Sequence, residues 1–205
     1  MTTSSRSKPA VTRVPVPCPA PPAAAVERCI KGLCLSCAIC CNGVLFADVR
    51  IPQPAQARAL CRAGLAVRRS RRSDATPALP QPCPALRPDN QCAFYHLRPA
   101  RCREFECALL QKLISGAVDL PEARRIVAMT LENAGQVRQG LRALEETHEE
   151  WPLARRFRRV KRSFARREIT EQAAATYADL TLDVHRLNMT LRHHFYPEPK
   201  DKRAS

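Results

Sequence analysis

Apolar residues recur at every third or fourth position through much of the second half of the chain. This spacing places them on one face of an α-helix. One such series is Val127, Leu131, Ala134, Val137, Leu141 and Leu144. Before it, Asp119-Leu-Pro-Glu122 combines a capping residue, an early proline and a glutamate three positions later. The pattern therefore predicts a long helix that begins just after Asp119.

Two more helices follow from the same spacing. Trp151-Pro152 interrupts the first helix and opens a second one. The second helix has an apolar stripe of Leu153, Phe157, Val160 and Phe164. A third and longer helix carries on one face Ile169, Ala173, Tyr177, Leu180, Val184, Leu187, Leu191 and Phe195. We expect these helices to pack as a hairpin or small bundle.

The first half of the chain has shorter and more varied elements. A β-prone run at 44–51 ends at Pro52, and residues 55–63 favour a helix that Gly64 stops. Arg, Ser and Pro dominate 68–82, which we predict to be a loop. Helical spacing begins again after Arg103, with Phe105, Leu109, Leu113 and a terminal Gly116.

These patterns predict a mainly α protein in which a small, irregular, cysteine-rich metal-binding domain precedes the helical hairpin or bundle. The first residues are rich in Ser, Thr, Pro and Ala and cannot bury enough apolar surface to fold. We therefore expect a disordered tail at 1–25 and a cysteine-cluster domain at 26–116. A helical extension follows at 117–197, and a second disordered tail at 198–205.

Composition narrows the class of protein. Of 205 residues, 45% are hydrophobic and only 5% aromatic, which argues against an all-β sandwich. Prolines interrupt the apolar N-terminal stretch, so we expect no secretory signal there. Because no apolar run reaches about 18 residues, we expect no membrane contact. The odd number of 11 cysteines excludes complete internal pairing, and we expect a reducing, cytoplasmic location where cysteines bind metals.

The first cysteine cluster has the spacing C-x-x-C-x-x-C-C and comprises Cys34, Cys37, Cys40 and Cys41. Zinc and the irons of iron–sulfur clusters are both held tetrahedrally by thiolates, and two-residue gaps let such thiolates converge. Adjacent side chains diverge, however, by about 100° in a helix. One member of the Cys40–Cys41 pair should therefore belong with a second group of cysteines.

The second cluster supplies that group, with Cys83, Cys92, Cys102 and Cys107. Eight cysteines suffice for two tetrahedral sites, and Cys18, Cys29 and Cys61 fall outside the pattern. Four thiolates around zinc or an oxidised four-iron cluster leave a charge of about −2, which cations or N–H donors must balance. Arg98 and Arg103 lie within the second cluster and are our candidates for contacting the bound group. Disulfides or simple burial of the thiols are the alternatives, but the density of cysteines favours metal.

The linked motifs resemble those of the bacterial YkgJ-type CxxCxxCC cysteine cluster family. The resemblance covers about residues 29–110 and includes C-P-x-L after the first cluster, then C-x-x-Y-x-x-R-P-x-x-C-R-x-F-x-C. In this chain the further matching positions are Tyr95, Arg98, Pro99, Arg103 and Phe105. The resemblance implies chelation of zinc or iron and a bacterial cytoplasmic origin, without an established reaction. Similar cysteine clusters occur in flagellin lysine methylases, but the likeness stops at the cysteine domain.

One further segment is strongly charged. Residues 155–167 contain eight basic residues and no acids, within a chain of formal charge +15. Such a helix can bind nucleic acid or an acidic protein, or can simply be a solvated face. We recognise no catalytic triad, phosphate-binding loop or catalytic carboxylate pair. The sequence therefore predicts a protein that binds zinc or iron with no assigned reaction; the alternatives are an iron–sulfur redox protein or enzyme component and a metal-scaffolded nucleic-acid-binding protein.

Overall fold

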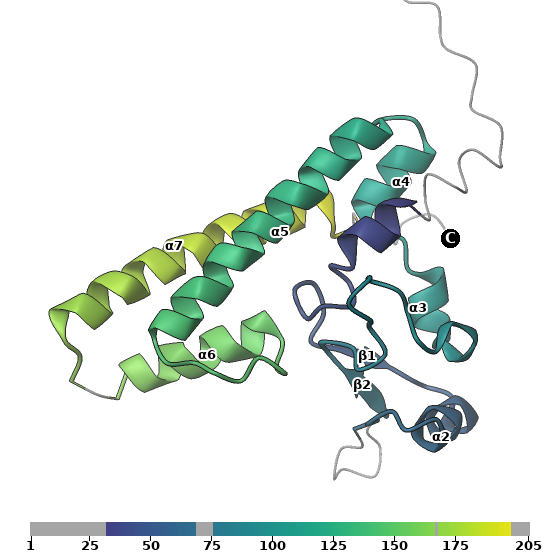
Figure 1. Cartoon of the computed structure of the whole chain (residues 1–205), viewed down its shortest axis with the longest axis horizontal. Helices are drawn as coiled ribbons and strands as arrows, with labels where there is room; N and C mark the ends of the chain where they lie inside the picture. The colour runs from purple at the N-terminus through teal and green to yellow at the C-terminus, as the bar shows by residue number, and fades with distance from the viewer. Residues whose placement is uncertain (1–31, 69–75, 167, 198–205) are drawn as a thin grey trace, which may run out of the picture.

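The computed structural model describes residues 32–68, 76–166 and 168–197, and the predicted tails 1–25 and 198–205 lie outside the described residues, as do Cys18 and Cys29. Helices dominate the described chain, so the prediction of a mainly α fold is confirmed. Two long helices form a hairpin, and the short elements that carry the cysteines gather around one end of it (Figure 1). None of the described helices is long and apolar enough to cross a membrane.

The hairpin consists of α5 (Leu120–Ala143) and α7 (Glu171–His194). Each begins at a side-chain cap: Asp119 Oδ1 accepts the Glu122 N–H at 2.8 Å, and Thr170 Oγ1 accepts the Ala173 N–H at 3.2 Å. Ile169 precedes the second cap and is exposed, so its assignment to the buried face of α7 was wrong. A residue outside the helix does not follow the helical period.

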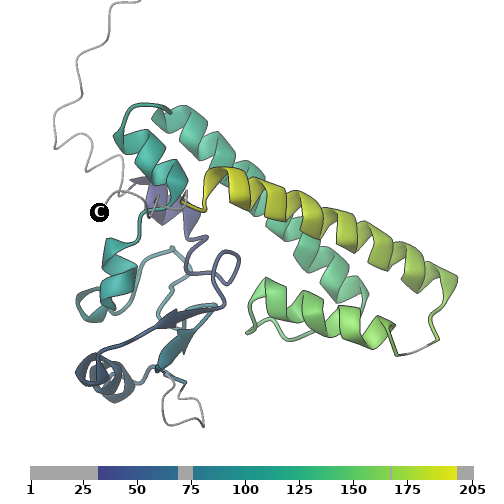
Figure 2. The same cartoon turned by 180° about the vertical axis from the view of Figure 1, so that it is seen from behind.

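The two helices run antiparallel. Asn133 of α5 donates to Thr190 of α7, and further along α5 Gly140 lies against Leu180. The helix α6 (Leu153–Phe164) packs beside them, as both views show (Figures 1 and 2). Its first turn reaches the cysteine-bearing region, because the Leu153 N–H donates to the Gly43 carbonyl at 3.1 Å.

A single hydrophobic core joins the hairpin to the first cysteine segment. Phe195, at the end of α7, is 1% exposed and packs with Leu109 and with Ile39, which lies between cysteines. The Tyr196 hydroxyl also donates to the Leu45 carbonyl at 3.4 Å. The hairpin therefore supports the cysteine loop directly.

A second, smaller core lies under a two-stranded antiparallel sheet. Strand β1 (Asp48–Arg50) pairs with β2 (Ala78–Pro80), and Val49 faces Leu79 in the register. Helix α2 (Pro54–Arg62) contributes the buried Leu60 to this core. The predicted loop at 68–82 was thus wrong over β2, since three residues carry too little pattern to reveal a strand before its partner is known.

The second cysteine segment contains a 3₁₀ turn η1 (Tyr95–Leu97) and helices α3 (Ala100–Glu104) and α4 (Ala108–Ile114). The predicted continuous helix through Phe105 and Leu109 was wrong. Phe105 has extended backbone angles, φ −75° and ψ 119°, and Cys107 caps a new helix. The break turns α4 toward the main core, where Leu109 is fully buried.

Candidate metal centre

The first cysteines occupy a helical turn that ends abruptly. Residues 32–37 are helical, and Ala38 then takes a left-handed conformation with φ 49°. Its carbonyl accepts the N–H groups of Cys41 at 2.8 Å and Asn42 at 2.9 Å, which closes a tight turn. The helical period therefore holds for Cys34 and Cys37 but not for the two cysteines after the turn.

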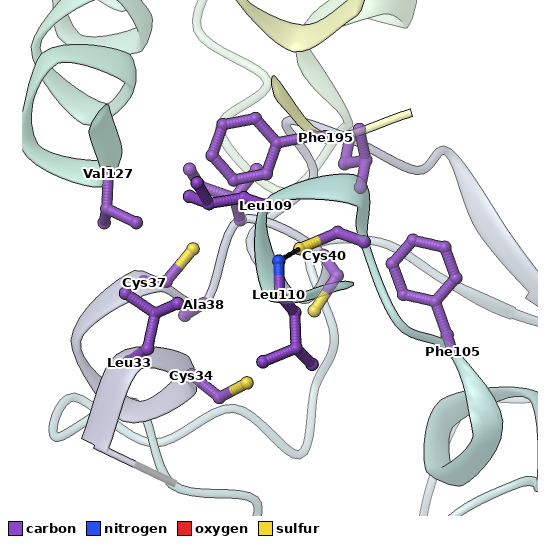
Figure 3. Close-up of a pocket in the computed structure, with 13 residues that line it drawn as sticks. Leu33, Cys34, Cys37, Ala38, Cys40, Phe105, Leu109, Leu110, Val127 and Phe195 are labelled. Atoms are coloured by element: carbon purple, nitrogen blue, oxygen red, sulfur yellow. Dashed lines mark hydrogen bonds between the residues drawn. The ribbon is translucent and has the colours of Figure 1, made fainter. Parts of the chain in front are cut away.

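Four thiols face one cavity. The space measures about 60 Å³, and its cysteines are Cys34, Cys37, Cys40 and Cys107. The remaining lining is apolar and comes from the main core, including Leu109, Val127 and Phe195 (Figure 3). Cys107 comes from the second cluster of the sequence, yet it joins three cysteines of the first. We call these four residues the first set.

The other four cysteines form a second set, namely Cys41, Cys83, Cys92 and Cys102. The Cys83 N–H donates to the Cys41 carbonyl at 2.7 Å, which fixes the two segments together. An isolated antiparallel β-bridge pairs Leu86 with Cys92, so Cys92 lies beside the segment that follows Cys83. Burial raises the pKa of Cys102, and the nearby thiols of Cys41, Cys83 and Cys92 raise it further. Cys41 therefore lies near thiols of the second cluster, and it also raises the pKa of Cys34 and Cys37 of the first.

The two sets meet at Cys40 and Cys41, whose sulfur atoms are 3.8 Å apart. A hydrogen bond within this pair raises the pKa of Cys40 and lowers the pKa of Cys41 to about 7. Of the two thiols, Cys41 is therefore the one that loses its proton first.

Burial keeps most of the other thiols protonated. It raises the pKa of Cys37 to about 12 and the pKa of Cys102 to about 11. It also raises the pKa of Cys34 and of Cys107. A buried thiolate needs a compensating positive charge, and a bound cation supplies one.

Backbone N–H groups already point at several sulfur atoms. The Leu110 N–H donates to Cys107 Sγ at 3.4 Å, and the backbone of Ile39 and of Ala85 similarly lowers the pKa of Cys37 and Cys83. These donors lie two or three residues after each cysteine. They stabilise the charged thiolate, which is the form that binds metal.

Gln81 is a polar neighbour that the sequence did not reveal. It is 2% exposed, and its side-chain hydrogen bond lowers the pKa of Cys83. Gln81 Oε1 has no hydrogen-bond partner among the described residues. A glutamine two positions before a cysteine is too common a pattern to be found from the sequence.

The two candidate arginines differ in position. Arg98 is half-buried; its Nη2 donates to the Cys102 carbonyl at 2.7 Å, and its charge lowers the pKa of Cys34, Cys41 and Cys102. It therefore acts on thiols of both sets. Arg103 is exposed on α3, and its charge is not among those that shift the pKa of these thiols.

Residues 33–128 match the model of the CxxCxxCC family, described as "Putative zinc- or iron-chelating domain". This part of the chain is therefore similar to that family. The CxxCxxCC domain starts on the helical turn of the first set and ends within α5. No curated protein is significantly similar to the chain, and no solved structure is either.

The donor groups of the CxxCxxCC domain suit zinc or iron. All nine cysteines in the described part of the chain are free, so none of these thiols is consumed by a disulfide there. As they stand, no three Cys, His, Asp or Glu side chains of the described residues are positioned to hold an ion. Binding would therefore have to draw the sulfur atoms of each set closer together.

Proposed function

We propose that this protein binds zinc or iron at two neighbouring sites, each formed by four cysteine thiolates. The first site uses Cys34, Cys37, Cys40 and Cys107, and the second uses Cys41, Cys83, Cys92 and Cys102. The observation that carries this proposal is that Cys34, Cys37, Cys40 and Cys107 line one cavity, while Cys41, Cys83 and Cys92 all lie close enough to Cys102 to raise its pKa. Four is the number of ligands that a tetrahedral thiolate site requires.

The residues around the cysteines would balance the negative charge of the bound group. Four thiolates leave an excess of negative charge on either zinc or an oxidised four-iron cluster. We assign Arg98 as the cation that balances this charge, and the N–H groups of Leu110, Ile39 and Ala85 as donors to the sulfur atoms. Arg103 remains a candidate that the solvent screens more strongly.

A redox role is the second candidate function. The first set surrounds a cavity that is apolar almost throughout, at one end of a well-packed core. A single zinc ion with Zn–S distances of about 2.3 Å would fill the centre of its four ligands. An iron–sulfur cluster needs more room and a dry environment, and when bound it supplies electron transfer. The cavity therefore favours the cluster at the first site.

The metal content of the full chain distinguishes these functions. Protein purified without oxygen should contain two thiolate-bound metal centres per chain. Colourless protein with two zinc ions supports a structural role. Brown protein with iron and acid-labile sulfide supports the redox candidate. Protein with neither metal contradicts the proposal.

Single substitutions test how the cysteines are divided. Cys34→Ser and Cys107→Ser should each remove the same one of the two centres, and Cys92→Ser should remove the other. Cys61→Ser is the matched control, because Cys61 is an exposed cysteine on α2, and it should keep both centres. If Cys107→Ser and Cys92→Ser empty the same site, the division is wrong.

A further inference from the structure

Helix α6 carries a dense positive charge. The two proposed metal sites do not explain this charge, because none of their cysteines lies on α6. Its sequence, LARRFRRVKRSF, has six basic residues and no acid. In the structure three of these cations contact groups outside the helix. Arg156 is 2% exposed and donates to the Glu146 carbonyl at 2.8 Å, and Arg159 reaches the Glu146 carboxylate at 3.2 Å. Arg155 lies over the Trp151 ring, 3.6 Å from its centre.

The other cations face the solvent. They are Arg158, Lys161 and Arg162 on α6 and Arg166 just after it. Among the described residues, no acidic side chain forms a salt bridge with any of them. Arg158 and Arg162 lie four residues apart on α6, about 6 Å along its axis, and Arg166 follows in the turn just after the helix. They form a row of positive charge, which we call the α6 basic row.

Neighbouring cations on α5 extend this positive field. Arg138 is half-buried, and burial, Arg156 and Arg142 all lower its pKa. Glu149 pairs with Arg142 at 2.6 Å and neutralises only part of the charge. A surface with several like charges raises the local concentration of a polyanion.

We propose that the α6 basic row binds the phosphate backbone of a nucleic-acid duplex without reading its bases. A row of exposed arginines suits a repeating phosphate chain, whose charges it can neutralise. Proteins that bind single strands add exposed aromatic rings on which bases stack. Here Trp151 is already stacked on His148 at 3.9 Å and covered by Arg155, and Phe157 and Phe164 pack against the core. The helix therefore offers phosphate contacts but no stacking surface.

The test measures binding of the full, metal-loaded chain to a labelled 20-base-pair duplex by fluorescence anisotropy over a series of salt concentrations. Each phosphate contact contributes roughly 0.9 to the slope of log K against log [salt]. Arg158→Gln, Arg162→Gln and Arg166→Gln together should lower this slope by about 2.7 and weaken binding at least tenfold at low salt. DNA and RNA duplexes are separate arms of the experiment, and binding to either supports the proposal.

The matched control removes three arginines elsewhere. Arg50, Arg58 and Arg62 are exposed on β1 and α2, so their replacement by Gln changes the net charge equally. This control should retain most of the wild-type slope. Circular dichroism and metal content should be unchanged in both variants. Equal losses in the two triple variants would overturn the proposal, as would tighter binding to a single strand or to an acidic peptide than to either duplex.

Discussion

Arg98 is the residue whose charge couples the two cysteine sets. Arg98 is half-buried, and its guanidinium donates to the carbonyl of Cys102. Its positive charge stabilises thiolates of both sets. The ring of Tyr95 lies 5.0 Å from its guanidinium carbon and limits the directions it can take. The effect of Arg98 on the thiols is therefore electrostatic, and the position of its guanidinium determines which thiols it stabilises.

Substitution of the two arginines should separate their roles. Arg98→Gln should weaken metal binding by roughly 10- to 100-fold, the range for residues that support metal ligands. Arg103→Gln should change it by less than about threefold, since an exposed charge is screened. Competition with a chromophoric chelator measures both affinities. Arg98→Lys should restore part of the loss if the charge matters, and equal effects of Arg98→Gln and Arg103→Gln would contradict this assignment.

At the scale of elements, close packing of α5 on α7 depends on one glycine. A methyl group added at Gly140 would lie 3.1 Å from Leu180 Cδ1 and 3.2 Å from Leu180 Cβ. Leu180 is 1% exposed and cannot move freely. Gly135 lies on the same helix, and an added methyl group there would have no neighbour within 4 Å.

The two glycines should therefore respond in opposite ways to the same substitution. Gly135→Ala should raise the free energy of unfolding by about 0.5–1 kcal/mol, because alanine favours the helix. Gly140→Ala should lower it by about 1–3 kcal/mol, because the extra methyl group overpacks the contact between α5 and α7. Urea denaturation of the two variants measures both changes. An increase in stability for Gly140→Ala would show that the helices can separate without cost.

At the scale of the whole molecule, the thiols should make stability depend on pH in two opposite ways. Without metal, the pKa of Cys37 is about 12 and that of Cys102 about 11 in the folded state. Unfolded thiols have a pKa of about 8.5. The folded state then holds more protons, so its stability is complete below about pH 8.5 and falls as pH rises toward 11–12. Cys41, with a pKa of about 7, opposes this trend only between pH 7 and 8.5.

Bound metal reverses the direction in which stability changes with pH. Bound thiolates stay deprotonated, so their effective pKa falls below that of the unfolded chain, and stability is lost as pH falls. Urea unfolding at several pH values should therefore show the loaded protein gaining stability between pH 6 and 8. The chelator-treated protein should lose stability from about pH 9 upward. A chelator-treated protein that becomes more stable above pH 9 would contradict the assigned burial of Cys37 and Cys102.

The sequence by itself determined the long helices and the set of candidate ligands. The periodic apolar residues of α5, α6 and α7 report burial that repeats every turn, so local pattern is enough. In the structure the two sulfur atoms of the Cys40–Cys41 pair lie only 3.8 Å apart, although the prediction that one member belongs with the second cluster rests on the divergence of adjacent side chains. That argument depends on covalent geometry alone.

Only the tertiary structure decided which cysteines face one another. Cys107 joins Cys34 because the chain breaks at Phe105 and α4 turns its cap toward the core, where Leu109 is buried. The pairing of β1 with β2, the donation from Gln81 and the different exposures of Arg98 and Arg103 likewise depend on contacts between distant segments. Such contacts leave no periodic pattern along the chain, since each is made once, between residues that only folding brings together.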